Sequence, residues 1–188
     1  GTVYTFALTV SVRSTGVSTT ESITFETNRP PSGGSCDVSP RFGYVQVTDF
    51  TAVCSNWIDI DAPLRYQFES FDNSTAKSSI FCTYQTPTYC VMSLAPSPSS
   101  DNTTVKITVQ DSLGSEADPV YIPVMVQFKE TFNSADAASA AANAAQSGDM
   151  LSVAGSVSIV SSYIQSNNSI DKQTLQTTAE KMLSAIAV

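Results

Sequence analysis

The chain is divided by a stretch of seven residues, which reads Asn28-Arg29-Pro30-Pro31-Ser32-Gly33-Gly34. Neither proline can donate a backbone hydrogen bond to a β-ladder, and two successive glycines leave the backbone without a preferred conformation. Patterns typical of strands lie on both sides of this stretch. We therefore expect it to be a joint between two structural units.

A β-hairpin is predicted before the joint. Residues 4–12 alternate apolar and polar side chains, and the apolar ones share one face: Tyr4, Phe6, Leu8, Val10 and Val12. A turn is expected over 13–16, and a returning strand over 22–27.

A β-sandwich is predicted after the joint. Short strands are expected near residues 35–39, 43–54, 64–71, 78–84, 89–94, 103–110 and 119–128. Seven short strands with turn signals between them are typical of an immunoglobulin-like or fibronectin type III-like sandwich. Because Pro119 and Pro123 cannot donate to a ladder, the last strand is expected at a sheet edge.

The two strand regions contain a weak internal repeat. Leu8-Thr9-Val10 followed by Ser14-Thr15-Gly16 is similar to Ile107-Thr108-Val109 followed by Ser112-Leu113-Gly114, at an offset of 98 to 99 residues. This offset is about the length of one sandwich domain. The repeat predicts that residues 1–28 are the last hairpin of a preceding sandwich and that 29–128 form the complete one.

Residues 129–188 change from strand to helix periodicity. An alanine-rich helix is expected from residue 134 to 146, with Asn133 or Ser134 as its N-cap and Gly148 just beyond its end. A second helix should follow Asp149 with an apolar stripe of Met150, Val153, Ala154, Val157, Val160 and Ile164. A third should carry Leu175, Ala179, Met182, Leu183 and Ile186 on one stripe. The predicted fold class is thus mainly β, a sandwich with a C-terminal three-helix segment.

Composition excludes several function classes. The 188 residues carry a formal charge of −8, no histidine and only 14% charged side chains, whereas 50 residues are Ser or Thr. Without histidine there is no Ser-His-Asp or Cys-His catalysis and no histidine zinc site. The acidic balance argues against nucleic acid and against anionic membrane surfaces as partners.

Four cysteines, Cys36, Cys54, Cys82 and Cys90, lie at spacings of 18, 28 and 8 residues. Four cysteines allow three pairings, which spacing alone does not settle. We favour Cys36–Cys54 across two antiparallel strands and Cys82–Cys90 around a hairpin loop. The cross-sheet disulfide of antibody domains is expected to be absent, because strand 103–110 has no cysteine.

Three acceptor sequons for N-glycosylation occur, at Asn73, Asn102 and Asn167. Together with an even cysteine count they favour an oxidising, extracellular setting. The ends of the chain do not resemble natural termini, which predicts that it is a piece of a longer protein.

One short segment contains three candidate functional residues, Trp57, Asp59 and Asp61. Trp57 suits either a sugar-binding platform or a core anchor beside Cys54, which we favour. The two aspartates suit a glycosidase acid/base pair, a calcium site or a turn fixed by Asx hydrogen bonds. We favour the turn, and predict no catalytic residue, no cofactor and no metal, with Asp59 and Asp61 as the calcium candidates. The segment 111–116 is expected to be a solvated hairpin tip.

Two segments carry a family resemblance. Residues 28–40 follow the pattern N-x-P-P-x-G-G-x-C-x-V-x-P, and residues 54–66 follow C-x-x-W-x-D-x-D-x-P-L-x-Y. Together they resemble the receptor-for-egg-jelly (REJ) module of polycystin-type cell-surface receptors. The tail from residue 146 onward resembles the helical subdomain that opens a GAIN autoproteolysis domain, although the cleavage motif of that domain is absent.

The resemblance implies an extracellular, multi-sandwich stalk on a membrane-anchored receptor. Such a stalk would space or transmit force and bind extracellular glycoproteins or matrix, without catalysis. Family members often partner a polycystin-type cation channel, at ciliary, flagellar or gamete membranes. The alternative is a carbohydrate-binding adhesin module of a secreted glycoprotein, which predicts that Trp57, Tyr84 and Tyr89 line up exposed on one face.

Overall fold

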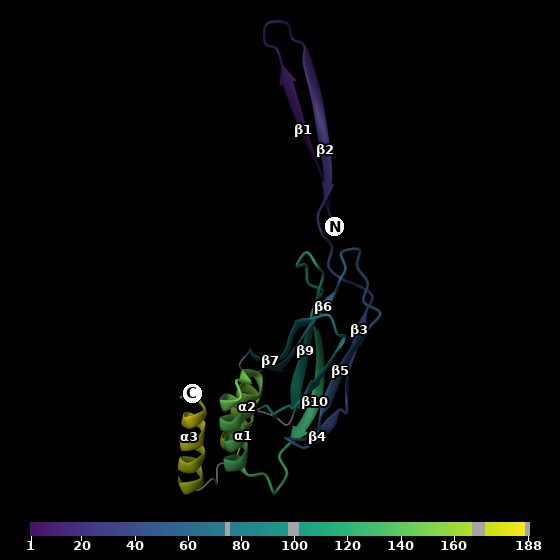
Figure 1. The fold of residues 1–188 in the computed structure, drawn as a ribbon. Coiled ribbons are helices and arrows are strands. Elements are labelled where there is room, and N and C mark those ends of the chain that lie inside the picture. The colour runs from purple at the N-terminus through teal and green to yellow at the C-terminus, as the bar shows by residue number, and fades with distance from the viewer. Residues whose placement is uncertain (74–75, 98–101, 167–171, 187–188) are drawn as a thin grey trace.

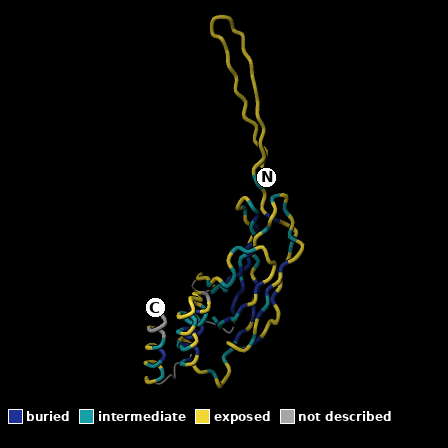
Figure 2. Tube along the Cα trace, viewed as in Figure 1, coloured by how far each residue is buried: buried dark blue, intermediate teal, exposed yellow. Residues whose placement is uncertain are grey.

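The computed structural model describes residues 1–73, 76–97, 102–166 and 172–186 of the chain (Figure 1). It begins with a two-stranded antiparallel hairpin, β1 (Val3–Ser11) and β2 (Ser18–Glu26). The turn between them contains Gly16 at φ +71°. The hairpin projects away from the rest of the molecule and is exposed along its whole length (Figure 2).

Two packed sheets follow the joint. One has five strands in the order β4-β10-β9-β6-β7, and the other has three in the order β3-β5-β8. The strands are β3 (Ser35–Ser39), β4 (Phe42–Tyr44), β5 (Phe50–Ser55), β6 (Arg65–Asp72), β7 (Lys77–Gln85), β8 (Tyr89–Met92), β9 (Asn102–Gln110) and β10 (Val120–Gln127). With the three helices after them, these sheets confirm the predicted fold class.

The strand predicted over 43–54 is two strands that belong to different sheets. β4 pairs in parallel with β10, whereas β5 lies between β3 and β8. The chain turns between them, with Gln46 at φ +57° and the Thr48 hydroxyl accepting from the Tyr44 N–H at 3.0 Å. Because apolar residues continue through this turn, the sequence pattern does not reveal the break.

The predicted edge position of the last strand is only half correct. β10 lies between β9 and β4, and the N–H of Met125 donates to the carbonyl of Arg41 at 2.9 Å. β4 pairs only with Met125–Gln127, so the part of β10 that contains Pro123 has a neighbour on one side, β9. Pro123 is two residues from Met125, so its missing N–H falls on the open side of β10.

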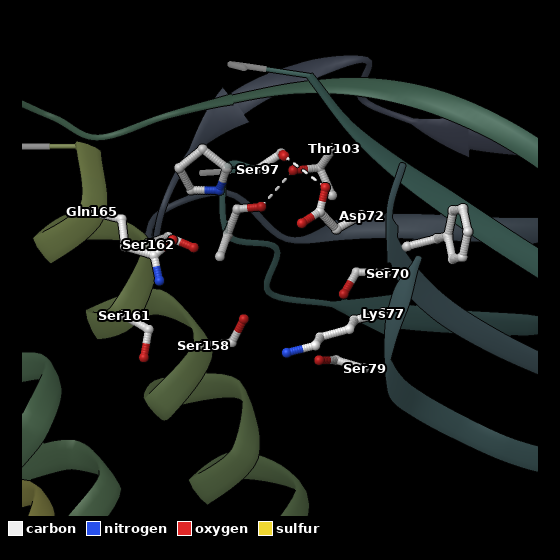
Figure 3. Close-up of a pocket in the computed structure, with 13 residues that line it drawn as sticks. Ser70, Asp72, Lys77, Ser79, Ser97, Thr103, Ser158, Ser161, Ser162 and Gln165 are labelled. Atoms are coloured by element: carbon white, nitrogen blue, oxygen red, sulfur yellow. Dashed lines mark hydrogen bonds between the residues drawn. The ribbon is translucent and has the colours of Figure 1, made fainter. Parts of the chain in front are cut away.

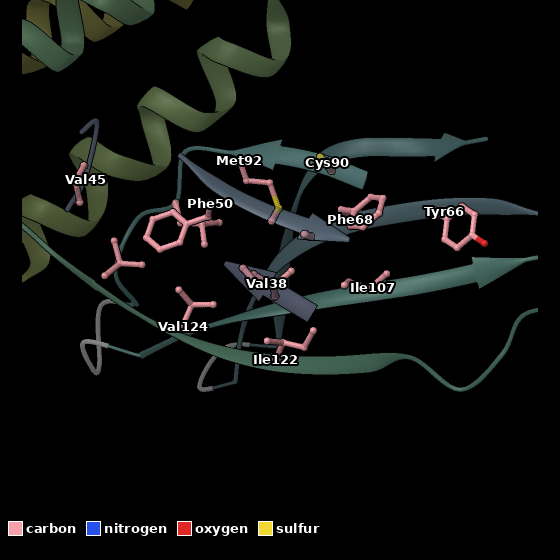
Figure 4. Packing of buried hydrophobic residues seen from close by; sticks show 14 of the residues in the cluster. Val38, Val45, Phe50, Tyr66, Phe68, Cys90, Met92, Ile107, Ile122 and Val124 are labelled. Atoms are coloured by element: carbon pink, nitrogen blue, oxygen red, sulfur yellow. The ribbon is translucent and has the colours of Figure 1, made fainter. Parts of the chain in front are cut away.

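The core lies between the two sheets and consists of the inward side chains of alternating strand positions (Figure 4). Its fully buried members from the five-stranded sheet include Phe68, Val105, Ile107 and Val124. Burial of each such side chain contributes about 1.5–3 kcal/mol. The opposite sheet contributes Val38, Phe50, Ala52 and Met92.

The helices are α1 (Ser134–Gln146), α2 (Met150–Ser166) and α3 (Lys172–Ile186). Asn133 caps α1 by accepting from the N–H of Ala135 at 2.9 Å, and Gly148 beyond its end has φ +77°. Asp149 caps α2 by accepting from the N–H of Ser152 at 3.1 Å. Within the described chain, none of these helices combines the length and the apolar character needed to cross a bilayer.

The helix faces differ from the predicted stripes. α2 buries Val153, Ile159 and Val160, but Met150 is exposed. Leu175 and Leu183 of α3 are also exposed. α3 instead contacts α1 through polar groups, because Thr178 is buried with its hydroxyl 3.1 Å from that of Ser134. The Lys181 ammonium also donates to the Ser139 hydroxyl of α1 at 2.8 Å.

Candidate functional site

Both favoured disulfides are present. Cys36–Cys54 joins directly paired positions of β3 and β5 within the three-stranded sheet. Cys82–Cys90 joins β7 to β8, which are the edge strands of different sheets. The expectation that residues 82–90 form a hairpin is therefore wrong, because β7 and β8 belong to different sheets. β9 contains no cysteine, so the cross-sheet disulfide of antibody domains is absent as predicted, and a link between sheet edges is present instead. The chain crosses from one sheet to the other between these two cysteines, and the bond ties the two edges together.

The joint brings the two sequence motifs of the chain into contact. Ser32 and Ile58 exchange two backbone hydrogen bonds of 3.0 Å, which pair the Pro/Gly stretch with the segment after β5. The indole of Trp57 lies against Gly34, where an added Cβ would come within 2.1 Å of the ring. Trp57 is partly buried and packs on the core cluster, which is the anchor role that we favoured over a sugar platform.

An acidic cluster lies at the same end of the sandwich. Asp59 accepts from the N–H of Asp61 at 2.8 Å, an Asx turn. The carbonyl of Asp61 accepts from the N–H of Ser112 at 2.9 Å, which ties this turn to the β9–β10 loop. That loop brings in Asp111, and one carboxylate oxygen from each of the three aspartates lies within 4.8 Å of the others.

Asp111 is the member of this cluster that sequence reasoning missed. Asp111 is fully buried, so the expectation that segment 111–116 is a solvated hairpin tip is wrong for this residue. Its Oδ1 accepts from the N–H groups of Leu113 and Ser115 at 2.9 Å each, and its Oδ2 accepts from the Asn28 amide at 2.5 Å. An Asp followed by a small polar residue and a glycine three positions on is a signal for such a self-closed loop.

The hydrogen bonds of Asp111 determine its charge. Burial by itself raises the pKa of this carboxyl group, but the hydrogen bonds from Asn28 and the backbone of Ser115 and Leu113 outweigh burial and lower the pKa. Asp111 is therefore an anion at neutral pH. A glycosidase acid needs a raised pKa, so the acid/base reading of this cluster gains no support.

Two of the three sequons lie close together at the other end of the sheet. Asn73 follows β6 and Asn102 begins the neighbouring β9, and both are exposed. The amide of Asn73 donates to the Thr104 hydroxyl at 3.0 Å. Asn167 lies outside the described residues. Glycosylation of these positions stays a prediction.

An open pocket of about 240 Å³ lies where α2 meets the edge of the five-stranded sheet (Figure 3). Its lining is rich in hydroxyl groups: Ser70, Ser79, Ser97, Thr103, Ser158, Ser161 and Ser162. Several are already engaged, since Ser97 donates to Asp72 at 3.2 Å and Thr103 donates to the carbonyl of Ala95 at 2.5 Å. The signal for this pocket was present in the sequence, because Ser158, Ser161, Ser162 and Gln165 follow helical i, i+3, i+4, i+7 spacing.

Fold and bonding together define a disulfide-stabilised β-sandwich module of the kind that extracellular proteins use. The model of the REJ domain family matches residues 1–159, more than four-fifths of the chain, and the chain therefore belongs to the REJ domain family. REJ domains are non-catalytic extracellular modules of polycystin-type proteins. The match passes through the joint and ends within α2, so the resemblance of the later residues to a GAIN domain stays a prediction.

Proposed function

We propose that this chain is part of an extracellular stalk of a polycystin-like membrane receptor. The stalk spaces the ends of the receptor, transmits force along tandem sandwiches and binds extracellular glycoproteins or matrix, and these residues perform no catalysis. A polycystin-type cation channel is the proposed partner of the whole receptor, on a ciliary or flagellar membrane.

The observation that carries this proposal is the shared register of two hairpins. Adding 99 to both members of the Phe6–Ile23 pair in β1–β2 gives Val105–Ile122, which are partners in β9–β10. Tyr4–Phe25 maps in the same way onto Thr103–Val124. Agreement of register goes well beyond the matched triplets, because a slip of one residue would move every side chain to the other face.

Exposure of the equivalent side chains differs completely between the hairpins. Val105 and Ile107 of β9 are 0% exposed in the core, whereas Phe6 and Leu8 at the corresponding positions of β1 are 60% and 69% exposed. The apolar face of β1–β2 thus has the side chains of a sandwich core without an opposing sheet. We propose that the missing strands belong to a preceding sandwich of the same kind, which makes the stalk a tandem array.

The joint suits transmission of force between such units. Asn28, two residues after β2 ends, is hydrogen-bonded to Asp111, and Ser32 is paired with Ile58. A pull on the hairpin therefore reaches the loops of the next sandwich through contacts on both sides of Pro30 and Pro31. Cys36–Cys54 lies in the first strand pair after the joint.

The adhesin alternative has less support. It predicted exposed aromatic side chains on one face, but Trp57 is packed against Gly34 and the Tyr84 hydroxyl is bonded to Glu116. Tyr89 is the exposed member of that set. Screening the chain against a glycan array tests this alternative, which predicts binding that is lost in Tyr89→Ala.

The tandem arrangement is tested by comparing this chain with one extended by the preceding 75 or so residues of its parent. The short chain should bind an apolar dye at β1–β2 and self-associate, and the extension should abolish both. Leu8→Lys should leave the stability of the short chain unchanged but destabilise the extended one. Thr9→Lys, on the opposite face of the same strand, is the matched control. Equal tolerance of Leu8→Lys in both chains would remove the basis of the proposal.

The adhesive role is tested separately. The extended chain should bind immobilised matrix glycoproteins or the extracellular part of a polycystin-type channel, measured by surface plasmon resonance. No binding to either would leave a spacer without an adhesive role.

A further inference from the structure

We propose that the joint between the hairpin and the sandwich binds calcium, with Asp59, Asp61 and Asp111 as carboxylate ligands and Asn28 as an amide ligand. This site would stiffen the connection between β2 and the sandwich. The proposed site does not depend on a further sandwich before the hairpin.

The first observation is that three carboxylates converge without a cationic partner in the part of the chain that the structure describes. One carboxylate oxygen from each of the three aspartates lies within 4.8 Å of the other two, although the residues come from two separate loops. The ion pairs among the described residues join the N-terminus, Arg29, Arg41 and Lys106 to Glu26, Asp37 and Glu69, and none of them involves this cluster. Like charges at this separation oppose one another, and a divalent cation among the three carboxylates would remove that cost.

The second observation is an unsatisfied oxygen beside the cluster. Asn28 donates from its amide nitrogen to Asp111 Oδ2 at 2.5 Å. The oxygen of the same carboxamide is buried and has no hydrogen-bond partner among the described residues. A buried acceptor without a donor costs free energy, and a bound cation would satisfy it.

The loops hold two of the three carboxylates, and the backbone of the third aspartate, in place before any ion arrives. Asp59 is fixed by the N–H of Asp61, the carbonyl of Asp61 by the N–H of Ser112, and Asp111 by two further N–H groups. Each carboxylate retains lone pairs that these bonds do not use. Carboxylate and amide oxygens are the ligands of hard cations, and Ca²⁺ accepts six to eight of them in flexible geometry, with water completing the set. Mg²⁺ demands a near-ideal octahedron and should bind more weakly.

The proposal is tested on the whole 188-residue chain, stripped with EDTA. Titration with CaCl₂ in a calorimeter should give one site with a Kd in the range of about 10⁻⁴–10⁻³ M that extracellular modules show. Saturating Ca²⁺ should raise Tm by roughly 4–8 °C. Tb³⁺ provides an independent probe, because its luminescence should be sensitised by Trp57, two residues before Asp59.

Asp61→Asn is the diagnostic variant, because it removes one ligand charge at a partly exposed position whose side chain holds no loop. It should weaken Ca²⁺ binding about 10-fold or more, and Asn28→Ala should weaken it to a smaller extent. Asp118→Asn removes the same charge from an exposed residue outside the cluster and should leave the affinity unchanged.

Three results would overturn the proposal. They are the absence of a Tm shift with 10 mM CaCl₂, an unchanged affinity in Asp61→Asn, and an equal loss in Asp118→Asn. The last would indicate diffuse attraction of Ca²⁺ to an acidic surface. If Asp61→Asn unfolds, Asp59→Asn and the Tb³⁺ signal of the unmodified chain decide the question.

Discussion

Among single residues, Gly34 has the clearest structural reason to be what it is. The indole of Trp57 occupies the space in which any side chain at position 34 would lie. The pair joins the Pro/Gly stretch to the segment after β5, so one close contact sets how the chain enters the sandwich. The requirement is for lack of a side chain, because Gly34 does not adopt a positive φ.

Gly34→Ala should therefore lower the free energy of unfolding by about 1–3 kcal/mol, since the indole must move away from the core to admit a methyl group. Urea denaturation followed by Trp57 fluorescence measures both the loss and the displacement. Gly155→Ala is the control, because nothing lies within 4 Å of an added Cβ there. Because Gly155 lies within a helix, Gly155→Ala should raise the free energy of unfolding by up to about 1 kcal/mol. Equal stability of Gly34→Ala and the parent chain would contradict the packing described for the joint.

Tyr84 shows a second effect at this scale. Burial and the hydrogen bond to Glu116 raise the pKa of its hydroxyl to about 12. A raised pKa in the folded state stabilises the fold below the ordinary tyrosine pKa of 10, and this contribution is lost as the pH rises from 10 to 12.

Glu116→Gln should bring the pKa of Tyr84 down toward 10, because the negative charge that opposes ionisation is removed. Absorbance at the tyrosinate band measures this during an alkaline titration, with Tyr84→Phe identifying the contribution of this residue. A titration curve unchanged by Glu116→Gln would show that the hydrogen bond does not set the pKa.

Among the elements, the edge strands β7 and β8 depend on a covalent link. They belong to different sheets, and Cys82–Cys90 holds their edges together. α2 packs beside them, with Ile159 and Val160 in the core cluster. Closure of this side of the sandwich therefore requires both the disulfide and the helix.

Replacing Cys82 and Cys90 together by serine should lower the free energy of unfolding by roughly 2–3 kcal/mol. Hydrogen exchange should accelerate in both β7 and β8, because neither sheet edge is then held to the other. The matched control is the double serine variant of Cys36 and Cys54, in which faster exchange should be confined to β3 and β5. Unchanged exchange in β7 after loss of Cys82–Cys90 would contradict a sheet-linking role.

For the whole molecule, acid stability should depend on the contact between the joint and the sandwich. The pKa of Asp111 is lowered below its ordinary value of 3.8 by Asn28 and the loop backbone. A lowered pKa stabilises the fold above the ordinary value, and this stabilisation is lost as the pH falls through the folded-state pKa.

Asn28→Ala should therefore make the loss of stability below the ordinary aspartate pKa of 3.8 less steep than in the parent chain. Urea midpoints measured across that range test the slope. Asn143→Ala, at an exposed position of α1, is the control and should leave the slope unchanged. Parallel curves for Asn28→Ala and the parent chain would show that Asn28 does not lower the pKa of Asp111.

At this scale, local pattern predicts elements but not their partners. Alternation in residues 4–12 and the caps at Asn133 and Asp149 predicted a strand and two helix starts, because these signals lie within a few residues. The break between β4 and β5, the link between sheets and the burial of Asp111 depend on contacts between distant segments. No local signal encodes which sheet a three-residue strand such as β4 joins.

The residues of the acidic cluster were also predictable only where they lie close together in the sequence. Asp59 and Asp61 are two positions apart in the chain and were visible as a pair, whereas Asp111 and Asn28 reach them only through folding. The hydroxyl stripe of α2 was visible but resembled an ordinary solvated face, because serine spacing does not tell which neighbour a helix will have.

The two disulfides also fix how far the sandwich can lengthen if it is pulled apart. A sandwich of about 100 residues has a contour length near 350 Å at roughly 3.5 Å per residue. Cys36–Cys54 and Cys82–Cys90 keep 18 and 8 residues in closed loops that cannot extend under load. About a quarter of the contour is thereby withheld, leaving roughly 260 Å. The redox state of the surroundings would then set the step length of this sandwich when it is unfolded under tension.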